Sequence, residues 1–173
     1  MLRHLVGIAK GGHVLDVACG GGRHIAACLD LGLRVTGVDR DTGAARQRFA
    51  GKPGLELIEA DLEDGRLFPF GPASFDGIVV VNYLWRPVLP AIIGAAKRSG
   101  LIIYQTFRTG NERYGKPSNP DFLLRPNELL DAVAGRLLVI TYEETHLREP
   151  DRLVQRIVAA GPDHTWVNDP PAL

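Results

Sequence analysis

The sequence predicts an α/β protein with a doubly wound, mostly parallel β-sheet and helices on both faces. Short apolar, β-branched runs alternate with helical stretches, and Gly and Pro separate them. A glycine-rich loop follows the first run. Only four residues, 148–151, join the last two runs, which favours a hairpin and one antiparallel strand. The length suits one domain, which we expect to span residues 1–173.

The first two strands are expected at residues 13–18 and 33–39, because both runs are short, apolar and β-branched. Residues 22–31 between them read as a helix. Gly32 is the type of residue that ends such a helix. A helix that crosses from one strand to the next returns the chain to the same edge, so these strands should run parallel.

A second helix is expected over residues 42–50, with Asp41 able to cap it. Residues 55–61 predict the third strand, which is more amphipathic than the first two. The turn residues within 62–74 predict a loop, with room for a short helical piece.

The segment 75–84 is richest in β-branched residues, so we expect this fourth strand at the centre of the sheet. A helix is predicted over residues 87–100, with proline at its start and glycine at its end. Residues 101–107 predict the fifth strand. A long polar segment, 108–126, follows it, and segments of this kind more often have a function than not.

The last third of the chain predicts a helix and the terminal hairpin. The helix is expected over residues 126–135, and the two strands at 136–147 and 152–161.

The composition limits the classes of partner. The chain has 20 basic and 20 acidic side chains and a net charge of zero, which gives general nucleic-acid binding no electrostatic support, although a local patch stays open. No run approaches the roughly 18 apolar residues of a membrane span. Two cysteines make a poor disulfide framework, and residues 1–10 lack a secretory pattern, so we expect a cytoplasmic protein. The oligomeric state stays open.

The segment HVLDVACGGGRH, residues 13–24, places an acid and then three glycines between a strand and a helix. The start of a helix attracts anionic groups, although a plain tight turn would have the same pattern. Asp39 ends the second strand 19 positions after Gly20, where a carboxylate can hold both ribose hydroxyls. Asp61 ends the third strand. Each acid alone is also compatible with a cap or a loop, but Asp16, Asp39 and Asp61 together predict a nucleoside across the strand tips.

The loop does not fit a dinucleotide site well. Gly20 and Gly22 match the first two positions of the G-x-G-x-x-G fingerprint, but Ile25 stands at the third. Asp16, just before the loop, would repel a phosphate and would suit a ligand with a cationic amine.

The residues LDVACGGGRH, followed by GVD and EAD, resemble the class I S-adenosylmethionine-dependent methyltransferases. The small size and the residues GRH also resemble small bacterial enzymes of the tellurite-resistance type. The resemblance implies a Rossmann-like, seven-stranded sheet in the order 3-2-1-4-5-7-6 with the last strand antiparallel. It also implies a transferase with S-adenosyl-L-methionine as cofactor, and we assign no metal ligand.

The resemblance assigns the cofactor to the strand tips. Asp16 would orient the methionyl amine through water, and Asp39 would hold the ribose. Arg23 or His24 would reach the methionyl carboxylate, unless both are only solvated residues at the helix start. We expect Cys19 to be a packed side chain and not a nucleophile. The cofactor-binding residues expected are Asp16, Ala18, Gly20, Gly22, Arg23, Asp39, Arg40, Asp61, Leu62 and Asn82.

The methyl acceptor is expected beside the tip of the fourth strand. Asn82 and Tyr83 are the catalytic candidates there, although Asn82 would also suit a role in fixing the next loop. Arg86 would bind an anionic acceptor or cap backbone carbonyls, and Trp85 would wall the acceptor pocket or pack into the core. The substrate-binding residues expected are Trp85, Arg86, Arg113 and Tyr114.

These residues predict methyl transfer to a small-molecule acceptor by in-line displacement. Methylation of RNA or protein is an alternative, and so is a non-catalytic S-adenosylmethionine-binding module. The N/D-P-P-Y/F pattern of nucleic-acid amino methyltransferases is absent after the fourth strand, and a nucleotide-dependent oxidoreductase is a weaker rival because of Ile25. Since about twelve residues precede the first strand, we expect an open pocket that residues 106–126 or another subunit covers.

Overall fold

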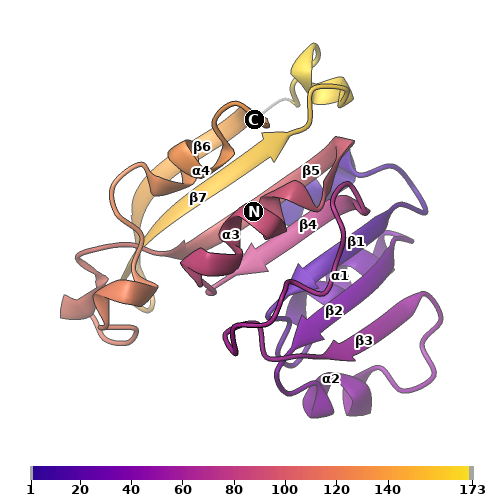
Figure 1. Ribbon diagram of the computed structural model, residues 1–173, viewed down its shortest axis with the longest axis horizontal. Helices are drawn as coiled ribbons and strands as arrows, with labels where there is room; N and C mark the ends of the chain where they lie inside the picture. The colour runs from indigo at the N-terminus through magenta and orange to yellow at the C-terminus, as the bar shows by residue number, and fades with distance from the viewer. Residues whose placement is uncertain (1, 172–173) are drawn as a thin grey trace.

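The computed structural model describes residues 2–171 and contains one seven-stranded sheet. The strands lie side by side in the order β3-β2-β1-β4-β5-β7-β6, with β7 antiparallel to both neighbours (Figure 1). This order and the antiparallel strand confirm the predicted fold class. The strands are β1 (His13–Val17), β2 (Arg34–Asp39), β3 (Leu55–Glu59), β4 (Phe75–Val81), β5 (Ala96–Phe107), β6 (Leu138–Leu147) and β7 (Arg152–Ala160).

The helices are short and cover both faces of the sheet. Because side chains alternate along a strand, Val14 and Leu15 of β1 enter different buried clusters. One cluster holds α1 and α2, and the other holds α3 and α4, which lie over the visible face of the sheet in Figure 1. The α-helices are α1 (Arg23–Asp30), α2 (Gly43–Arg48), α3 (Leu89–Gly94) and α4 (Glu128–Val133). The 3₁₀ helices are η1 (Leu2–Gly7), η2 (Arg86–Val88), η3 (Asn111–Arg113), η4 (Pro120–Phe122) and η5 (Thr165–Val167).

The fourth strand takes the central place that its composition predicts. Val79 and Val80 of β4 are fully buried, and β4 pairs in parallel with β1 and β5. The hairpin of β6 and β7 is likewise confirmed. Thr42 and not Asp41 is the N-cap residue of α2, but the Asp41 carboxylate, one residue earlier, accepts a hydrogen bond of 2.8 Å from the Gly43 amide at the start of this helix.

The helix predicted over residues 87–100 is wrong in its second half. Ala96 already pairs with Phe75 of β4, and Leu101 pairs with Gly77, so residues 97–100 bulge within an extended β5. Pairing with a central strand outweighs the helical pattern of this segment, as tertiary context often does.

The third crossover also differs from the repeated β–α pattern. Residues 60–74 form turns and no helix. Phe68 and Phe70 of this loop pack against the buried cluster and cover that part of the sheet. Phe68 and Phe70 thus cover a part of the sheet that a helix covers elsewhere in the fold.

The N-terminal segment lies away from the carboxyl ends of the parallel strands. A Cβ on Gly77 would meet the Ile8 side chain and Val14, which places Ile8 beside the first residues of β1 and β4. The segment that precedes β1 therefore does not roof the strand tips. Within residues 2–171, every helix is too short or too polar to pass through a bilayer.

Candidate functional site

Two adjoining cavities lie at the carboxyl ends of β1 to β4. The strand-tip cavity measures about 350 Å³, and the glycine-loop cavity about 300 Å³. Ala18 lines both cavities, and the consecutive residues Asn82 and Tyr83 each line one, so the two form an elongated site. The strand-tip cavity is lined by Ala18, Asp39, Arg40, Ala60, Asp61, Leu62, Glu63, Tyr83 and Phe122. The glycine-loop cavity is lined by Ala18, Cys19, Gly20, Gly21, Arg23, His24, Arg48, Val81 and Asn82.

The glycine loop needs its glycines for two different reasons. Gly20 and Gly22 have φ values of +50° and +76°, a region that favours glycine. A Cβ on Gly22 would approach the Phe49 ring to 2.4 Å, so this glycine lets the loop pack against the end of α2. A Cβ on Gly20 or Gly21 would meet no atom within 4 Å. These two glycines therefore face the open space of the glycine-loop cavity that they line.

Asp39 ties the glycine loop to the second strand. One carboxylate oxygen accepts a hydrogen bond of 2.8 Å from the Gly20 amide, and the other accepts one of 3.1 Å from Asp41. Because each carboxylate oxygen can accept more than one hydrogen bond, Asp39 keeps acceptor capacity toward the strand-tip cavity that it lines.

Asp16 is the least satisfied polar side chain of the site. Only 1 % of its surface is exposed, and neither carboxylate oxygen has a hydrogen-bond partner among the described residues. His24 Nδ1 lies 3.8 Å away. Burial raises the pKa of Asp16, and the His24 ring offsets this only in part. A buried acid without a partner indicates a missing cationic or hydrogen-bonding group.

The tip of β4 presents one polar side chain to each cavity. Asn82 has a φ of +58°, which is uncommon for a residue with a side chain. Its backbone N–H donates a hydrogen bond to the backbone carbonyl of Gln105. The Tyr83 hydroxyl is buried without a partner among the described residues. Burial raises the pKa of Tyr83, and the nearby Glu63 adds to this. Tyr83 therefore stays protonated at neutral pH and is available as a donor.

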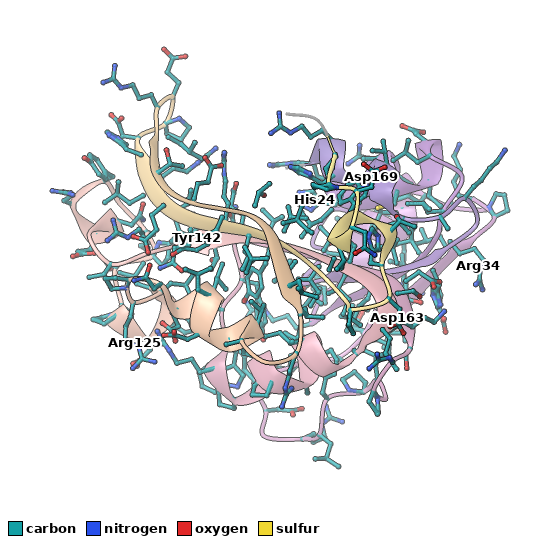
Figure 2. The ribbon with its side chains drawn as sticks, turned by 90° about the horizontal axis from the view of Figure 1, so that it is seen from above. His24, Arg34, Arg125, Tyr142, Asp163 and Asp169 are labelled. Atoms are coloured by element: carbon teal, nitrogen blue, oxygen red, sulfur yellow. The ribbon has the colours of Figure 1, made fainter. Side chains whose placement is uncertain are left out.

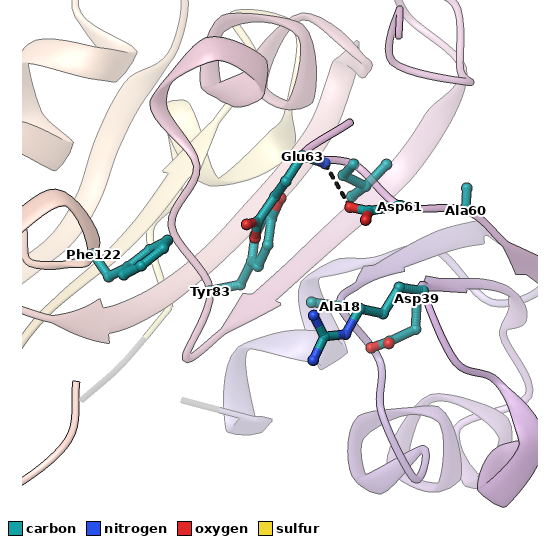
Figure 3. Close-up of a pocket in the computed structure, with 9 residues that line it drawn as sticks. Ala18, Asp39, Ala60, Asp61, Glu63, Tyr83 and Phe122 are labelled. Carbon is teal, nitrogen blue, oxygen red and sulfur yellow. Dashed lines mark hydrogen bonds between the residues drawn. The ribbon is translucent and has the colours of Figure 1, made fainter. Parts of the chain in front are cut away.

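Figure 3 shows how the walls of the strand-tip cavity face one another. Tyr83 and Phe122 stand on one side, and Ala18, Asp39 and Asp61 on the other, with Asp61 above Ala18 and Asp39 in this view. The Asp61 carboxylate accepts a hydrogen bond of 2.9 Å from the Glu63 amide. The cavity thus combines aromatic rings with carboxylates from two neighbouring strands.

Nearly all of the residues expected to bind cofactor lie at these cavities. The cavity linings include Ala18, Gly20, Arg23, Asp39, Arg40, Asp61, Leu62 and Asn82. Asp16 lies beneath the glycine-loop cavity beside His24. Cys19 is buried, and burial raises the pKa of its thiol to about 12, so it is a poor nucleophile, as expected.

Three of the four expected substrate-binding residues are placed elsewhere. The Tyr114 ring stacks on His146 of β6 with centroids 5.0 Å apart, and Arg113 lies over the Tyr114 ring. These two residues line neither cavity, because they pack on the terminal hairpin. Arg86 makes four hydrogen bonds to Glu128 and to the carbonyls of residues 121 and 123, so it caps carbonyls and does not face an acceptor.

The remaining candidate, Trp85, lies behind the cavity wall. Its ring centroid is 6.4 Å from that of Phe122, and it packs against the buried cluster. Sequence reasoning missed Phe122, Glu63 and Arg48 as lining residues. Phe122 belongs to the loop that was expected to cover the pocket, but the pattern favoured the cations and phenols of that loop over its phenylalanine.

The family comparison agrees with the glycine loop. A family profile described as a methyltransferase domain matches residues 14–99. This stretch contains β1 to β4 with the glycine loop, and it ends inside the bulge of β5.

Two curated relatives match parts of the same region. An O-methyltransferase of Penicillium expansum is 32 % identical over 80 residues, which are 44 % of this chain and 29 % of that protein. The ribosomal RNA small subunit methyltransferase H of Gemmatimonas aurantiaca is 54 % identical over 45 residues, 24 % of this chain and 14 % of that protein. The chain therefore spans less than a third of either relative.

Solved structures share the whole fold. A putative S-adenosylmethionine-dependent methyltransferase from Listeria monocytogenes has a TM-score of 0.70 at 15 % identity and covers 92 % of this chain and 94 % of its own. TehB from Haemophilus influenzae also has a TM-score of 0.70, at 18 % identity, over 92 % of this chain and 60 % of its own. Both likenesses concern the fold alone, and they agree with the fold that the resemblance implies.

Proposed function

We propose that this chain, which has the fold of class I S-adenosylmethionine-dependent methyltransferases and matches a methyltransferase-domain profile over residues 14–99, transfers a methyl group to a small-molecule acceptor. The observation that carries the proposal is the buried carboxylate of Asp16, which accepts no hydrogen bond of normal length among the described residues and has His24 Nδ1 3.8 Å away, beside a glycine loop that faces open space. A ligand with an ammonium group would supply the partner that Asp16 lacks.

The residues present fit S-adenosylmethionine. Asp16 lies behind the cavity lining and would orient the methionyl ammonium through a bridging water, and the backbone at Gly20 and Gly21 leaves room for the methionyl chain. Arg23 lines the same cavity and is the candidate for the methionyl carboxylate. Asp39 would accept from the ribose hydroxyls.

The adenine would lie in the strand-tip cavity. Asp61 and Leu62 line this cavity where the third strand ends, and the rings of Tyr83 and Phe122 form its opposite wall. Flat aromatic rings stack well on a base, and each such contact contributes roughly 1–3 kcal/mol to binding. Arg40 lines the cavity beside Asp39.

The chemistry asks mainly for positioning. When bound, S-adenosylmethionine supplies an electrophilic methyl group on a sulfonium. Asn82 and Tyr83, at the junction of the two cavities, would orient the acceptor, and holding reactants in line supplies much of the acceleration in reactions of this kind. Because its pKa is raised, Tyr83 would donate a hydrogen bond and would not act as a base.

A small molecule is the acceptor class that the chain supports best. Its net charge is zero, which gives general nucleic-acid binding no electrostatic support. The two curated relatives are named for different acceptors, one an O-methyltransferase and the other a ribosomal RNA methyltransferase. The acceptor atom is therefore left to experiment.

Binding of S-adenosylhomocysteine tests the cofactor site. We expect calorimetry to detect binding, and a crystal soaked with the compound to show density over Gly20, between Asp39 and Tyr83. Absence of binding at millimolar concentration contradicts the proposal. Methyl transfer is then measured over a panel of small molecules, RNA and protein. Tight binding without transfer to any of them would favour a non-catalytic binding module.

Replacement of Asn82 by glycine is expected to separate turnover from binding. Glycine keeps the backbone at its positive φ, whereas alanine adds strain of about 1 kcal/mol. With an acceptor found in the panel, we expect kcat of the Asn82→Gly variant to fall about tenfold or more, because a lost orienting contact costs at least this much. The S-adenosylhomocysteine Kd should stay within about twofold. An unchanged kcat would remove Asn82 from the catalytic residues.

A further inference from the structure

The Arg86 guanidinium donates all of its hydrogen bonds to the end of the loop between β5 and α4 and to the first residue of α4. Nε and Nη2 donate to the two carboxylate oxygens of Glu128, at 2.7 and 2.9 Å. Nη1 donates to the Asp121 carbonyl at 2.6 Å, and Nη2 to the Leu123 carbonyl at 2.8 Å. Four of the five guanidinium N–H groups are thereby used. The two carbonyls belong to the residues on either side of Phe122.

Glu128 is the fixed partner of this arrangement. It stands at the start of α4 and is buried, and one of its oxygens also accepts a hydrogen bond of 2.7 Å from the Arg125 amide. Burial alone would raise the pKa of Glu128, but the hydrogen bonds from Arg86 and Arg125 lower it to about 2. The carboxylate is therefore charged over the whole neutral range, and it binds both Arg86 and the end of the loop.

These contacts hold Phe122 in place from both sides. The next two residues along the loop, Leu123 and Leu124, are buried. Asn119 begins the 3₁₀ turn η4 by accepting a hydrogen bond of 3.0 Å from the Asp121 amide. Trp85, the neighbour of Arg86, places its ring 6.4 Å from the Phe122 ring. Phe122 is the one residue of segment 106–126 among those lining the two cavities.

We propose that Arg86 and Glu128 are positioning residues that hold the Phe122 ring as a wall of the strand-tip cavity. Arg86 follows β4 and Glu128 begins α4, so the pair connects the strand tip with the end of the covering loop. The two residues act on the bound nucleoside only through Phe122. The identity of that nucleoside rests on the proposed function, but the fixing of Phe122 does not.

A double-mutant cycle on S-adenosylhomocysteine affinity tests the proposal. We expect Phe122→Ala to raise the Kd by about tenfold or more, because it removes a stacking ring. Arg86→Lys keeps the positive charge opposite Glu128 but cannot reach the carboxylate and both carbonyls at once. We expect it to raise the Kd about three- to tenfold with Phe122 present, and to add less than twofold in the Phe122→Ala background.

Arg98→Lys is the matched control. Arg98 makes a comparable two-pronged pair with Asp163, at 2.8 and 3.0 Å. Asp163 and Arg125, which neighbours the Glu128 pair, lie toward opposite ends of the molecule in Figure 2. We expect Arg98→Lys to leave the Kd unchanged. If Arg86→Lys weakens binding equally with and without Phe122, the effect does not pass through the ring and the proposal is overturned.

Limited proteolysis with chymotrypsin adds a measurement that needs no ligand. We expect Arg86→Lys to speed cleavage after Phe122 at least about fivefold over the wild type and over Arg98→Lys. The reason is that the variant weakens the hydrogen bonds to the carbonyls of Asp121 and Leu123, the residues on either side of Phe122. If Arg86→Lys is cleaved after Phe122 at the rate of the wild type, the positioning role is overturned, whatever its S-adenosylhomocysteine affinity. Failure of the wild type to bind S-adenosylhomocysteine, with faster cleavage of Arg86→Lys, would contradict the proposed function and support the positioning role.

Discussion

The Asp39→Ala variant is expected to lose most of its affinity for S-adenosylhomocysteine. The substitution removes the carboxylate that would accept from the ribose hydroxyls, and hydrogen bonds to a charged group contribute about 1.5–3 kcal/mol. It also removes the bond from Asp39 to the Gly20 amide, so the glycine loop loses its link to β2. We expect the Kd measured by calorimetry to rise by about 10- to 100-fold.

Asp41→Ala is the control for this variant. The Asp41 carboxylate binds the Gly43 amide at the start of α2 and lines neither cavity. We expect this variant to lose about 1 kcal/mol of stability through the missing cap, with its affinity unchanged. If Asp39→Ala binds S-adenosylhomocysteine as tightly as the wild type, Asp39 has no part in the site.

The Asp16→Asn variant is expected to be more stable than the wild type and to bind S-adenosylhomocysteine more weakly. Asn has nearly the same shape, but it does not leave a charge buried without a partner. Because the neutral Asn amide replaces a carboxylate that is charged in a buried site, we expect the free energy of unfolding of the ligand-free protein at neutral pH to rise. Loss of the charge that orients the methionyl ammonium should raise the Kd about tenfold or more.

The gain in stability should depend on pH in a defined direction. The pKa of Asp16 is raised in the folded protein above its ordinary value of 3.8. As the pH rises above 3.8, the unfolded chain loses this proton first, so the wild type loses stability until the pH passes the folded pKa. The advantage of Asp16→Asn should therefore be absent in acid, grow through this interval and stay constant above it.

Urea unfolding of both proteins across this pH range measures the effect. His24→Gln is the matched variant, because it changes the neighbour of Asp16 and keeps the carboxylate. A lower stability of Asp16→Asn at neutral pH would show that Asp16 is satisfied within the free protein. The inference of an ammonium ligand would then lose its main support.

Local sequence was sufficient for the main frame of the fold and for half of the site. The strand tips that carry Asp39, Asp61 and Asn82 follow mainly from short apolar, β-branched runs and from the rule that parallel strands end at one edge. Residues 97–100 were placed wrongly, because their helical pattern gives no sign of the neighbouring strand with which β5 pairs. The turn residues correctly predicted the loop before β4, whereas the packing of Phe68 and Phe70 over the sheet is visible only in the structure.

The sequence by itself determined which side chains lie at the glycine loop and at the ends of the parallel strands. The order of strands and helices along the chain and the alternation of side chains place these residues at one edge of the sheet. The acceptor side was decided only in three dimensions. Arg86 meets Glu128, 42 positions further along the chain, and this contact turned an expected acceptor ligand into a support for Phe122. Only the structure shows that Asp16 is buried, whereas Asp39 and Asp61 are not. Partners so far apart in sequence, and the burial of a charge, depend on the packing of several elements at once, which no local pattern contains.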